Sequence, residues 1–194
     1  MKKLLWIMCV IPLVSHGQFK KGDTYVGGSF SRIDNGNGLY ITPFVGYFIN
    51  PRLALGADLQ VGYSRSEDIS QFGDGPHRVI NTTNGFVTSL TARRLYSISE
   101  KFFFALQGAA SYQRSLTKRE VPDLTTTSRS NSYGLGLSVA PLFMYFPSSR
   151  WSVEGGLGSL YYSFSRGLSD NTKYQSVGLN LGRVTLGFAY YFRK

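Results

Sequence analysis

A serine, an acid and a histidine lie close together in one short stretch of this sequence. Ser70, Asp74 and His77 are the residue types that activate a hydroxyl group for hydrolysis, with the histidine as general base. His77 follows Gly73-Asp74-Gly75-Pro76, which predicts a flexible loop. A catalytic base needs a partner within hydrogen-bond reach on a rigid support. The sequence therefore favours a surface histidine at position 77, and we predict neither a catalytic residue nor enzyme activity.

Metal, thiol and phosphate-loop chemistry have little support. Cys9 is the only cysteine, and no cluster of cysteines and histidines has the spacing of a transition-metal site. The glycines of Gly134-Leu135-Gly136 fall inside a predicted strand, whereas a phosphate loop connects a strand to a helix. We therefore predict no bound metal and no cofactor.

The first 17 residues have the pattern of a secretory signal peptide. Lys2-Lys3 precedes the apolar run Leu4–Val14, and Ser15-His16-Gly17 then places small residues before a cleavage site. The apolar run is too short to cross a hydrocarbon core, which needs about 20 residues in a helix. We predict cleavage after Gly17 and a single mature domain over residues 18–194.

The mature chain is strongly basic. The formal net charge is +10, and removal of Lys2 and Lys3 leaves 10 − 2 = +8. An exported protein with this excess of cations suits anionic partners such as the phosphates of lipopolysaccharide. The same cations could be ordinary solvated loop residues, and the sequence leaves both interpretations open. Nucleic acid is not expected as a partner of an exported protein.

Apolar and polar residues alternate along the mature chain, and no run of 18 apolar residues follows the signal. In Leu53–Tyr63 every second residue is apolar, and the residues between are Ala, Gly, Asp and Gln. Strands with one face for lipid and one for a polar interior are typical of a membrane barrel. A closed barrel leaves no backbone group unpaired in lipid. We therefore predict an all-β fold, an eight-stranded antiparallel up-and-down transmembrane β-barrel.

A repeat in the sequence supports a chain built from two-strand units. Arg52, Lys101 and Arg150 are 49 residues apart, and each precedes an alternating segment that ends at a tyrosine. A chain of this length holds four such units. The predicted strands are Thr24–Arg32, Leu39–Ile49, Leu53–Arg65, Ile80–Ser97, Phe102–Ser115, Ser130–Phe146, Trp151–Arg166 and Ser176–Phe192.

The predicted connections alternate in length. Short turns near Asn50-Pro51, Ile98-Ser99-Glu100 and Pro147-Ser148-Ser149 are typical of the periplasmic side of an outer-membrane barrel, where both termini would also lie. The outer side would carry two long polar loops, at Ser66–Val79 and Leu116–Arg129, and a medium one at Gly167–Gln175.

The alternation places four charged side chains inside the barrel, namely Asp58, Arg93, Glu154 and Arg183. Side chains fill the interior of an eight-stranded barrel, and an unpaired buried charge costs several kcal/mol. We predict a network in which the two acids meet the two arginines, without specifying the pairs, and which plugs the lumen. The alternative is that glycine-rich walls admit water and the charges stay solvated.

Aromatic residues gather at two levels one strand length apart, as expected for the two membrane interfaces. By the same alternation Arg94 points outward beside Tyr96, where it would extend to lipid headgroups. The predicted girdle at the turn side consists of Tyr47, Phe48, Tyr96, Phe102, Tyr145, Phe146, Trp151, Tyr190 and Phe192, and the girdle at the loop side of Tyr63, Tyr112, Tyr161 and Tyr162.

Three segments, Pro43–Phe48, Arg52–Tyr63 and Gly187–Phe192, resemble the family of small outer-membrane β-barrels that includes the OmpA transmembrane domain and OmpX, a porin-family-type barrel. The resemblance covers nearly all of residues 18–194. It implies a monomer in the outer membrane of a Gram-negative bacterium, in contact with membrane lipids and lipopolysaccharide. The last strand also resembles the signal read by the barrel-assembly machinery, although Arg193 and Lys194 follow its terminal phenylalanine.

The function indicated by these features is a non-enzymatic barrel with a structural, adhesive or envelope-interaction role through its outer loops. Some barrels of this size modify lipid A with a histidine, a serine and an acid, so a lipid A-modifying hydrolase is an alternative. A narrow channel or a component of a secretion machine is another. A soluble lipocalin-like barrel fits less well, because it would expose the apolar strand face to water.

Overall fold

The computed structural model describes residues 19–33, 37–72, 75–168 and 171–193, and the predicted signal peptide lies outside these ranges. Among the described residues, no helix is long and apolar enough to cross a membrane. The chain is a succession of strands with one short 3-10 turn, η2 (Pro122–Leu124), between the fifth and sixth. The strands are β1 (Thr24–Ile33), β2 (Asn37–Asn50), β3 (Leu53–Phe72), β4 (Gly75–Ser97), β5 (Phe102–Val121), β6 (Thr126–Ser148), β7 (Trp151–Gly167) and β8 (Lys173–Phe192).

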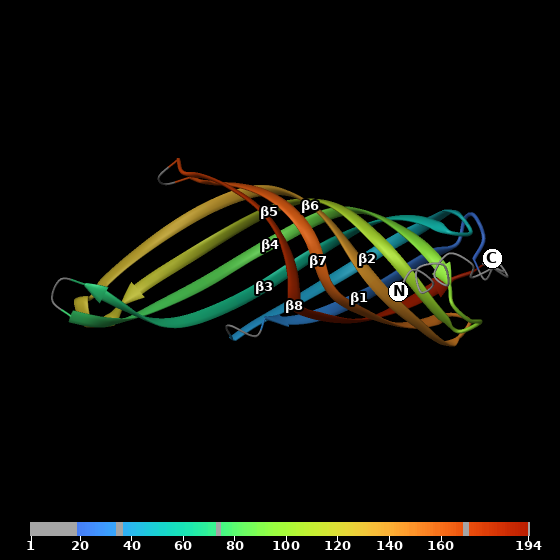
Figure 1. Ribbon diagram of the computed structural model, residues 1–194, viewed down its shortest axis with the longest axis horizontal. Coiled ribbons are helices and arrows are strands. Elements are labelled where there is room, and N and C mark those ends of the chain that lie inside the picture. The colour runs from blue at the N-terminus through green and yellow to red at the C-terminus, as the bar shows by residue number, and fades with distance from the viewer. Residues whose placement is uncertain (1–18, 34–36, 73–74, 169–170, 194) are drawn as a thin grey trace, which may run out of the picture.

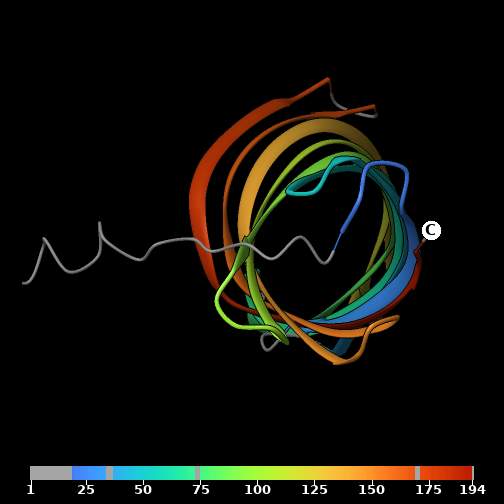
Figure 2. The same ribbon diagram turned by 90° about the vertical axis from the view of Figure 1, so that its right-hand side faces the viewer.

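Each strand pairs antiparallel with its neighbour along the chain, and β8 pairs with β1 to close the ring (Figures 1 and 2). The predicted eight-stranded antiparallel barrel is confirmed. The chain enters and leaves the barrel at one end, on the right of Figure 1, which we call the terminus end. The β3–β4, β5–β6 and β7–β8 hairpins project at the opposite end, which we call the hairpin end.

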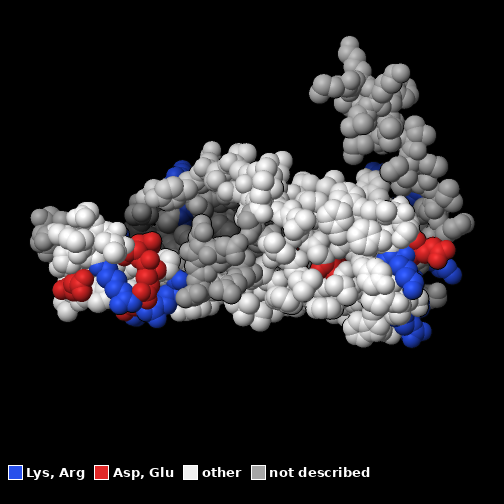
Figure 3. Space-filling model, turned by 60° about the horizontal axis from the view of Figure 1, so that its bottom comes forward, with Lys and Arg blue, Asp and Glu red and all other residues white. Residues whose placement is uncertain are grey.

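The outer face of the barrel is apolar between these two ends. Leu55, Leu59 and Val61 of β3 point outward and are 44–47% exposed, while Asp58 and Gln60 point inward. On the face shown in Figure 3, most charged side chains gather at the two ends of the molecule, with a largely uncharged surface between them. This distribution suits a barrel whose middle lies in hydrocarbon and whose ends meet water.

The long polar loops predicted at Ser66–Val79 and Leu116–Arg129 are wrong, because most of these residues belong to strands. β3 and β4 stay paired as far as Phe72 and Gly75, and β5 and β6 as far as Val121 and Thr126. Side chains across the strands support the extensions, as where the hydroxyl groups of Thr83 and Thr117 lie 3.0 Å apart. These strand extensions are polar on both faces, as expected for strands that project into water, so they lack the alternation from which strands were predicted.

Aromatic rings fill the lumen near the terminus end. The prediction of a polar interior is therefore wrong for this part of the barrel. Phe48 and Phe146, predicted to lie in the outward girdle, are 1% and 2% exposed and point inward with Tyr25, Phe103 and Tyr191. Tyr47 and Tyr145, which directly precede these two phenylalanines, point to the outer face instead. The rings of this cluster have centroids 5.2–5.9 Å apart in edge-to-face, tilted and stacked arrangements.

A β-bulge in β7 reverses the facing of Tyr161. The register between β7 and β8 shifts at Gly158, whose φ of +70° is rarely adopted by other residues. Beyond the bulge, Tyr162 pairs with Val177 on the outer face, whereas Tyr161 pairs with Gly178 and points inward. The prediction that Tyr161 lies in the hairpin-side girdle is therefore wrong, and Tyr162 occupies that level.

Candidate functional site

An ion pair crosses the lumen above the aromatic cluster. Arg93 of β4 and Glu154 of β7 are 5% and 3% exposed. Nη1 of Arg93 donates to both carboxylate oxygens of Glu154, at 3.1 and 2.9 Å. Both residues were predicted to point inward by alternation, and the barrel brings them together from strands that are not neighbours.

Neighbouring side chains satisfy the remaining atoms of this pair. Nε and Nη2 of Arg93 donate to Oε1 of Gln107, at 3.0 and 2.9 Å. Ser152 and the hydroxyl of Tyr191 each donate to Oε1 of Glu154, at 3.1 Å. Complete hydrogen bonding is what makes a buried ion pair tolerable, because each charge has lost its water. Sequence reasoning missed these three partners, although their inward parity could have identified them.

Aromatic rings also contact the guanidinium group of Arg93. Its Cζ atom lies 5.3 Å from the ring centroid of Tyr25 and 5.7 Å from that of Phe44, within the range of a cation–π interaction. Gly46 permits this arrangement, because a Cβ atom at that position would lie 2.1 Å from the Tyr25 ring. The ion pair therefore rests directly on the aromatic cluster.

The other two members of the predicted charge network do not extend the ion pair among the described contacts. Asp58 lines a polar cavity of about 210 Å³ together with Arg93, Gln107 and Glu154. The side chain of Arg183 lies outside the described residues. The cavity is on the hairpin side of the ion pair, so the lumen changes from aromatic to charged to polar along its axis.

Phe19, which precedes the first strand, closes the terminus end. Its ring is 2% exposed and stacks on Phe48, with centroids 4.5 Å apart and planes at 6°. It also contacts Phe103, Phe146 and Tyr191. A lone phenylalanine before a strand carries no recognisable sequence signal, so this stopper was not predicted.

Backbone and charge contacts hold the stopper in place. The amide of Gly22 donates to the carbonyl of Phe48 at 2.9 Å, and the amide of Lys20 donates to Oδ2 of Asp23 at 2.9 Å. On the opposite side, Cζ of Arg193 lies 4.7 Å from the centroid of the Phe19 ring. The two ends of the described chain thus meet at one mouth of the barrel.

The outward aromatic side chains form clusters around the terminus end. Trp151 and Tyr190 have centroids 5.0 Å apart, and Tyr190 and Phe192 are 4.9 Å apart. Tyr47, Phe102 and Tyr145 lie on the same outer face, while Tyr63 and Tyr112 lie outward nearer the hairpin end.

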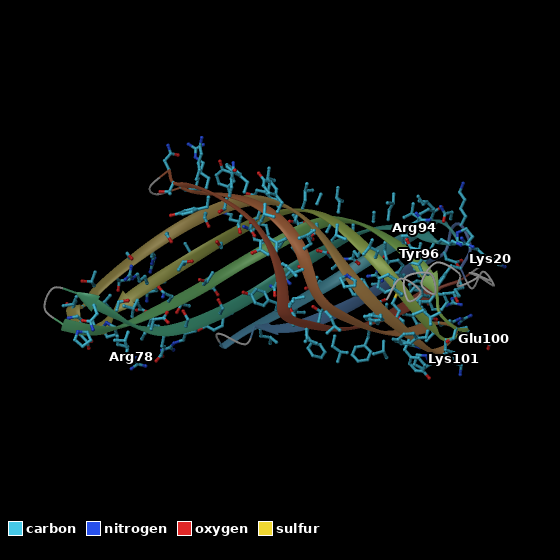
Figure 4. The ribbon with its side chains drawn as sticks, in the orientation of Figure 1. Lys20, Arg78, Arg94, Tyr96, Glu100 and Lys101 are labelled. Atoms are coloured by element: carbon cyan, nitrogen blue, oxygen red, sulfur yellow. The ribbon has the colours of Figure 1, made fainter. Side chains whose placement is uncertain are left out.

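Arg94 lies on the outer surface near the terminus end, next to Tyr96. Its Cζ atom is 5.5 Å from the Tyr96 ring centroid. In Figure 4 these two side chains lie at the same end of the molecule as Lys20, Glu100 and Lys101, and Arg78 lies at the opposite end. A cation in this place can reach headgroups while its stem covers an aromatic ring.

The hairpin end brings together a serine, a histidine and an acid. Ser70 lies directly opposite His77 in the β3–β4 pairing, and Nδ1 of His77 is 3.5 Å from Oδ2 of Asp123 in η2. The prediction that His77 sits in a flexible loop is wrong, since it belongs to β4. Asp74, the acid expected beside it, lies outside the described residues.

An exposed ion-pair cluster lies on the same hairpin. Glu67 accepts hydrogen bonds from Arg78 and, at 3.1 Å, from Arg65. The hydrogen bond from Arg78 is the main reason why the pKa of Glu67 lies below its usual value, and the nearby positive charges add to this effect. Within the described ranges, no three His, Cys, Asp or Glu side chains are placed to hold a metal ion.

Several solved structures share this fold. OprG from Pseudomonas aeruginosa is 13% identical with a TM-score of 0.54, and the match covers 91% of this chain and 99% of that one. A major outer membrane protein from Thermus thermophilus is 18% identical with a TM-score of 0.51, covering 88% and 99%. Ail from Yersinia pestis is 14% identical with a TM-score of 0.49, covering 89% and 99%. No protein-family model and no curated protein matches the sequence. The chain has the fold of the small outer-membrane β-barrels.

Proposed function

We propose that this protein is a non-enzymatic outer-membrane barrel of a Gram-negative bacterium whose outer surface binds lipopolysaccharide. In this proposal the terminus end is periplasmic and the hairpin end extracellular. The protein is exported by a cleaved signal peptide over residues 1–17, inserted by the barrel-assembly machinery and active as a monomer.

The observation that carries the proposal is a set of arginines just beyond the hairpin-side aromatic level. Arg65 follows Tyr63 by two residues on β3, and Arg114 follows Tyr112 by two residues on β5. Arg166 stands four residues beyond Tyr162 on β7. Since alternate residues of a strand share a face, each arginine lies on the outer side, beyond an interfacial ring. Lipid phosphates occupy that level, and guanidinium groups bind them through paired hydrogen bonds.

The test is a titration of the detergent-solubilised barrel with lipid A, followed by native mass spectrometry. The variant Arg65→Gln/Arg114→Gln/Arg166→Gln should bind lipid A at least tenfold more weakly, since each cation near an anionic lipid surface contributes about 1 kcal/mol. The matched control is Arg52→Gln/Lys101→Gln/Arg150→Gln, which removes the same charge at the terminus end. Equal losses in both variants would show a nonspecific charge effect and refute the proposal.

The contacts of His77 favour one second candidate, a hydrolase acting on lipid A. Ser70, His77 and Asp123 supply the residue types of a nucleophile, a base and an orienting acid. Nδ1 of His77 lies 3.5 Å from Oδ2 of Asp123. The test compares the lipid A of cells that express the His77→Ala variant with the lipid A of cells that express the wild-type protein. An identical lipid A profile in both, differing from cells without the protein, would exclude this role for His77.

A further inference from the structure

A row of cationic and aromatic side chains crosses the outer face of the barrel just beyond the hairpin-side aromatic level. Arg114 of β5 pairs with Tyr133 of β6, and Tyr133 pairs with Arg166 of β7. Arg166 in turn pairs with Lys173 of β8. Directly paired residues share a face of the sheet. This face is the outer one, because Leu135, two residues from Tyr133 on the same strand, is 58% exposed. We call Arg114, Tyr133, Arg166 and Lys173 the cation row.

The described residues of the chain supply no acid that pairs with the cation row. Nε and Nη2 of Arg166 both donate to Oδ1 of Asn171, at 2.7 Å for Nε, and this neutral amide orients the guanidinium group without cancelling its charge. Arg65, the third arginine of the proposed lipopolysaccharide surface, differs, because its Nη2 atom lies 3.1 Å from Oε1 of Glu67. The ion pairs between described residues include no member of the row. Arg114 and Arg166 are therefore better placed than Arg65 to bind a phosphate.

An apolar groove begins directly on the membrane side of the cation row. Its upper walls are the outward side chains that lie two residues below the row on β5, β6 and β7, namely Tyr112, Leu135 and Phe164. Farther down, Ala110 pairs with Leu90 on one side and with Leu137 on the other, so a methyl group lies between two larger side chains. The groove has a volume of about 620 Å³, within the range of roughly 300–1,000 Å³ that is typical of small-molecule sites.

The groove extends to about the middle of the apolar outer face. A second hollow of about 790 Å³ shares Ala110 and Leu137 with it and continues past Gly108 of β5. Gly108 is four residues from Tyr112, or about 14 Å along the strand. At a strand tilt of about 40° this is roughly 10 Å of depth, close to half of an apolar band of about 25 Å. The groove therefore has the depth of one membrane leaflet, the leaflet on the side of the cation row.

We propose that the wall of β5, β6 and β7 binds one lipid A molecule, with its phosphates on the cation row and an acyl chain in the groove. A headgroup with two phosphates fits the row, since Arg114 and Arg166 stand two strand spacings apart, roughly 10 Å. Guanidinium groups bind phosphates through paired hydrogen bonds, and Tyr133 between them offers a hydroxyl donor. The assignment rests on the proposed binding of lipopolysaccharide and restricts it to one wall, so that Arg65 on β3 lies outside the site.

Filling the groove tests the position of the acyl chain. A Cβ atom added at Gly108 would lie no closer than 4.0 Å to the atoms around it, so Gly108→Leu projects into the groove without displacing the backbone. The matched control is Gly155→Leu, which adds the same side chain to the outer face of β7 where nothing lies within 4 Å of the added Cβ atom. Detergent-solubilised barrels are titrated with lipid A and followed by native mass spectrometry, and heat-modifiable gel mobility checks that they are folded. Gly108→Leu should bind lipid A at least fivefold more weakly, and Gly155→Leu should bind it as the wild type does.

Single charge changes test the position of the headgroup. Arg114→Gln should weaken lipid A binding at least threefold. Arg65→Gln removes a cation that also stands two residues beyond an interfacial tyrosine, and it should leave the affinity unchanged. Phosphatidylglycerol, which has one phosphate, should bind to the wild-type barrel at least tenfold more weakly than lipid A.

The outcomes separate this site from lipopolysaccharide binding in general. Equal losses in Arg114→Gln and Arg65→Gln, or equal affinities of Gly108→Leu and Gly155→Leu, would overturn the assignment to this wall and leave binding by the outer arginines intact. Equal affinity for lipid A and phosphatidylglycerol would overturn the two-phosphate headgroup. No binding of lipid A by the wild-type barrel would refute both the site and the proposed function.

Discussion

Glu154 and Arg93 form a buried ion pair between two strands that are separated by β5 and β6. Each carboxylate oxygen accepts a hydrogen bond from the same guanidinium nitrogen, and Oε1 also accepts from Ser152 and Tyr191. The pair lies between the aromatic cluster and the polar cavity. Because the ion pair spans the lumen, it connects opposite walls of the barrel. Its loss should therefore lower the stability of the whole barrel.

We predict that Glu154→Gln destabilises the barrel by about 3–5 kcal/mol, since it leaves the charge of Arg93 buried without a counter-ion. Urea unfolding in lipid vesicles, followed by gel mobility, measures the change. Glu120→Gln is the control, because the exposed pair of Glu120 with Lys118 should contribute about 0–1 kcal/mol. Similar unfolding midpoints for the two variants would contradict the importance assigned to the buried pair.

Removal of the aromatic stopper should open the terminus end without unfolding the barrel. Phe19→Ala loses the ring contacts with Phe48 and Phe146, a change of about 3 kcal/mol for a buried phenylalanine. Trypsin cleavage after Lys20 or Lys21 in the folded protein should accelerate roughly a hundredfold. Tyr47→Ala, which removes an outward ring, should leave the cleavage rate unchanged. A slow rate in Phe19→Ala would mean that other contacts hold the segment.

The bulge at Gly158 should be intolerant of a side chain. A Cβ atom there would lie 2.2 Å from the carbonyl oxygen of Asn180, and the backbone has a positive φ. Gly158→Ala should therefore cost about 1–3 kcal/mol in unfolding experiments. Gly155→Ala is the matched control on the same strand, because nothing lies within 4 Å of its added Cβ atom. Equal stability of the two variants would contradict the position of the bulge at Gly158.

The facing of β3 can be tested with a single charge. Leu59→Arg should cost roughly 2–4 kcal/mol, because Leu59 lies on the apolar outer face away from both aromatic levels. Ile98→Arg places the same side chain in an exposed turn at the terminus end, where the cost falls to about 0–1 kcal/mol. Unfolding free energies in lipid vesicles compare the two, and equal costs would count against the facing of Leu59.

The ion-pair cluster of the β3–β4 hairpin should respond to acid. The pKa of Glu67 is lower in the folded hairpin than its ordinary value of 4.5, so its stabilising effect is present above that value. It is lost as the pH falls through the lowered, folded-state pKa. NMR titration of the Arg78 Nε–H signal should show a transition below pH 4.5 that is absent in Glu67→Gln. A transition at higher pH would reverse the assigned direction.

Alternation in the sequence determined which side chains face lipid over most of the barrel, because successive residues of a strand point to opposite faces. It identified Arg93 and Glu154 as inward, Leu55 and Leu59 as outward, and the number of strands. The same rule misplaced Tyr161, because the bulge at Gly158 inserts a residue and reverses the parity beyond it. The alternation rule also predicted that β3 ends at Arg65, whereas the strand continues to Phe72. Strands outside a membrane carry polar residues on both faces, so the alternation stops before the strand does.

Only the tertiary structure decided which inward residues meet. Arg93 pairs with Glu154 and not with Asp58 because closure of the barrel sets the register of every strand, and register determines which side chains share a level of the lumen. Phe19 reaches the mouth of the barrel for the same reason: its position depends on rings contributed by strands far apart in the sequence. Facing is a local property of a strand, whereas pairing across a lumen is a property of the closed ring.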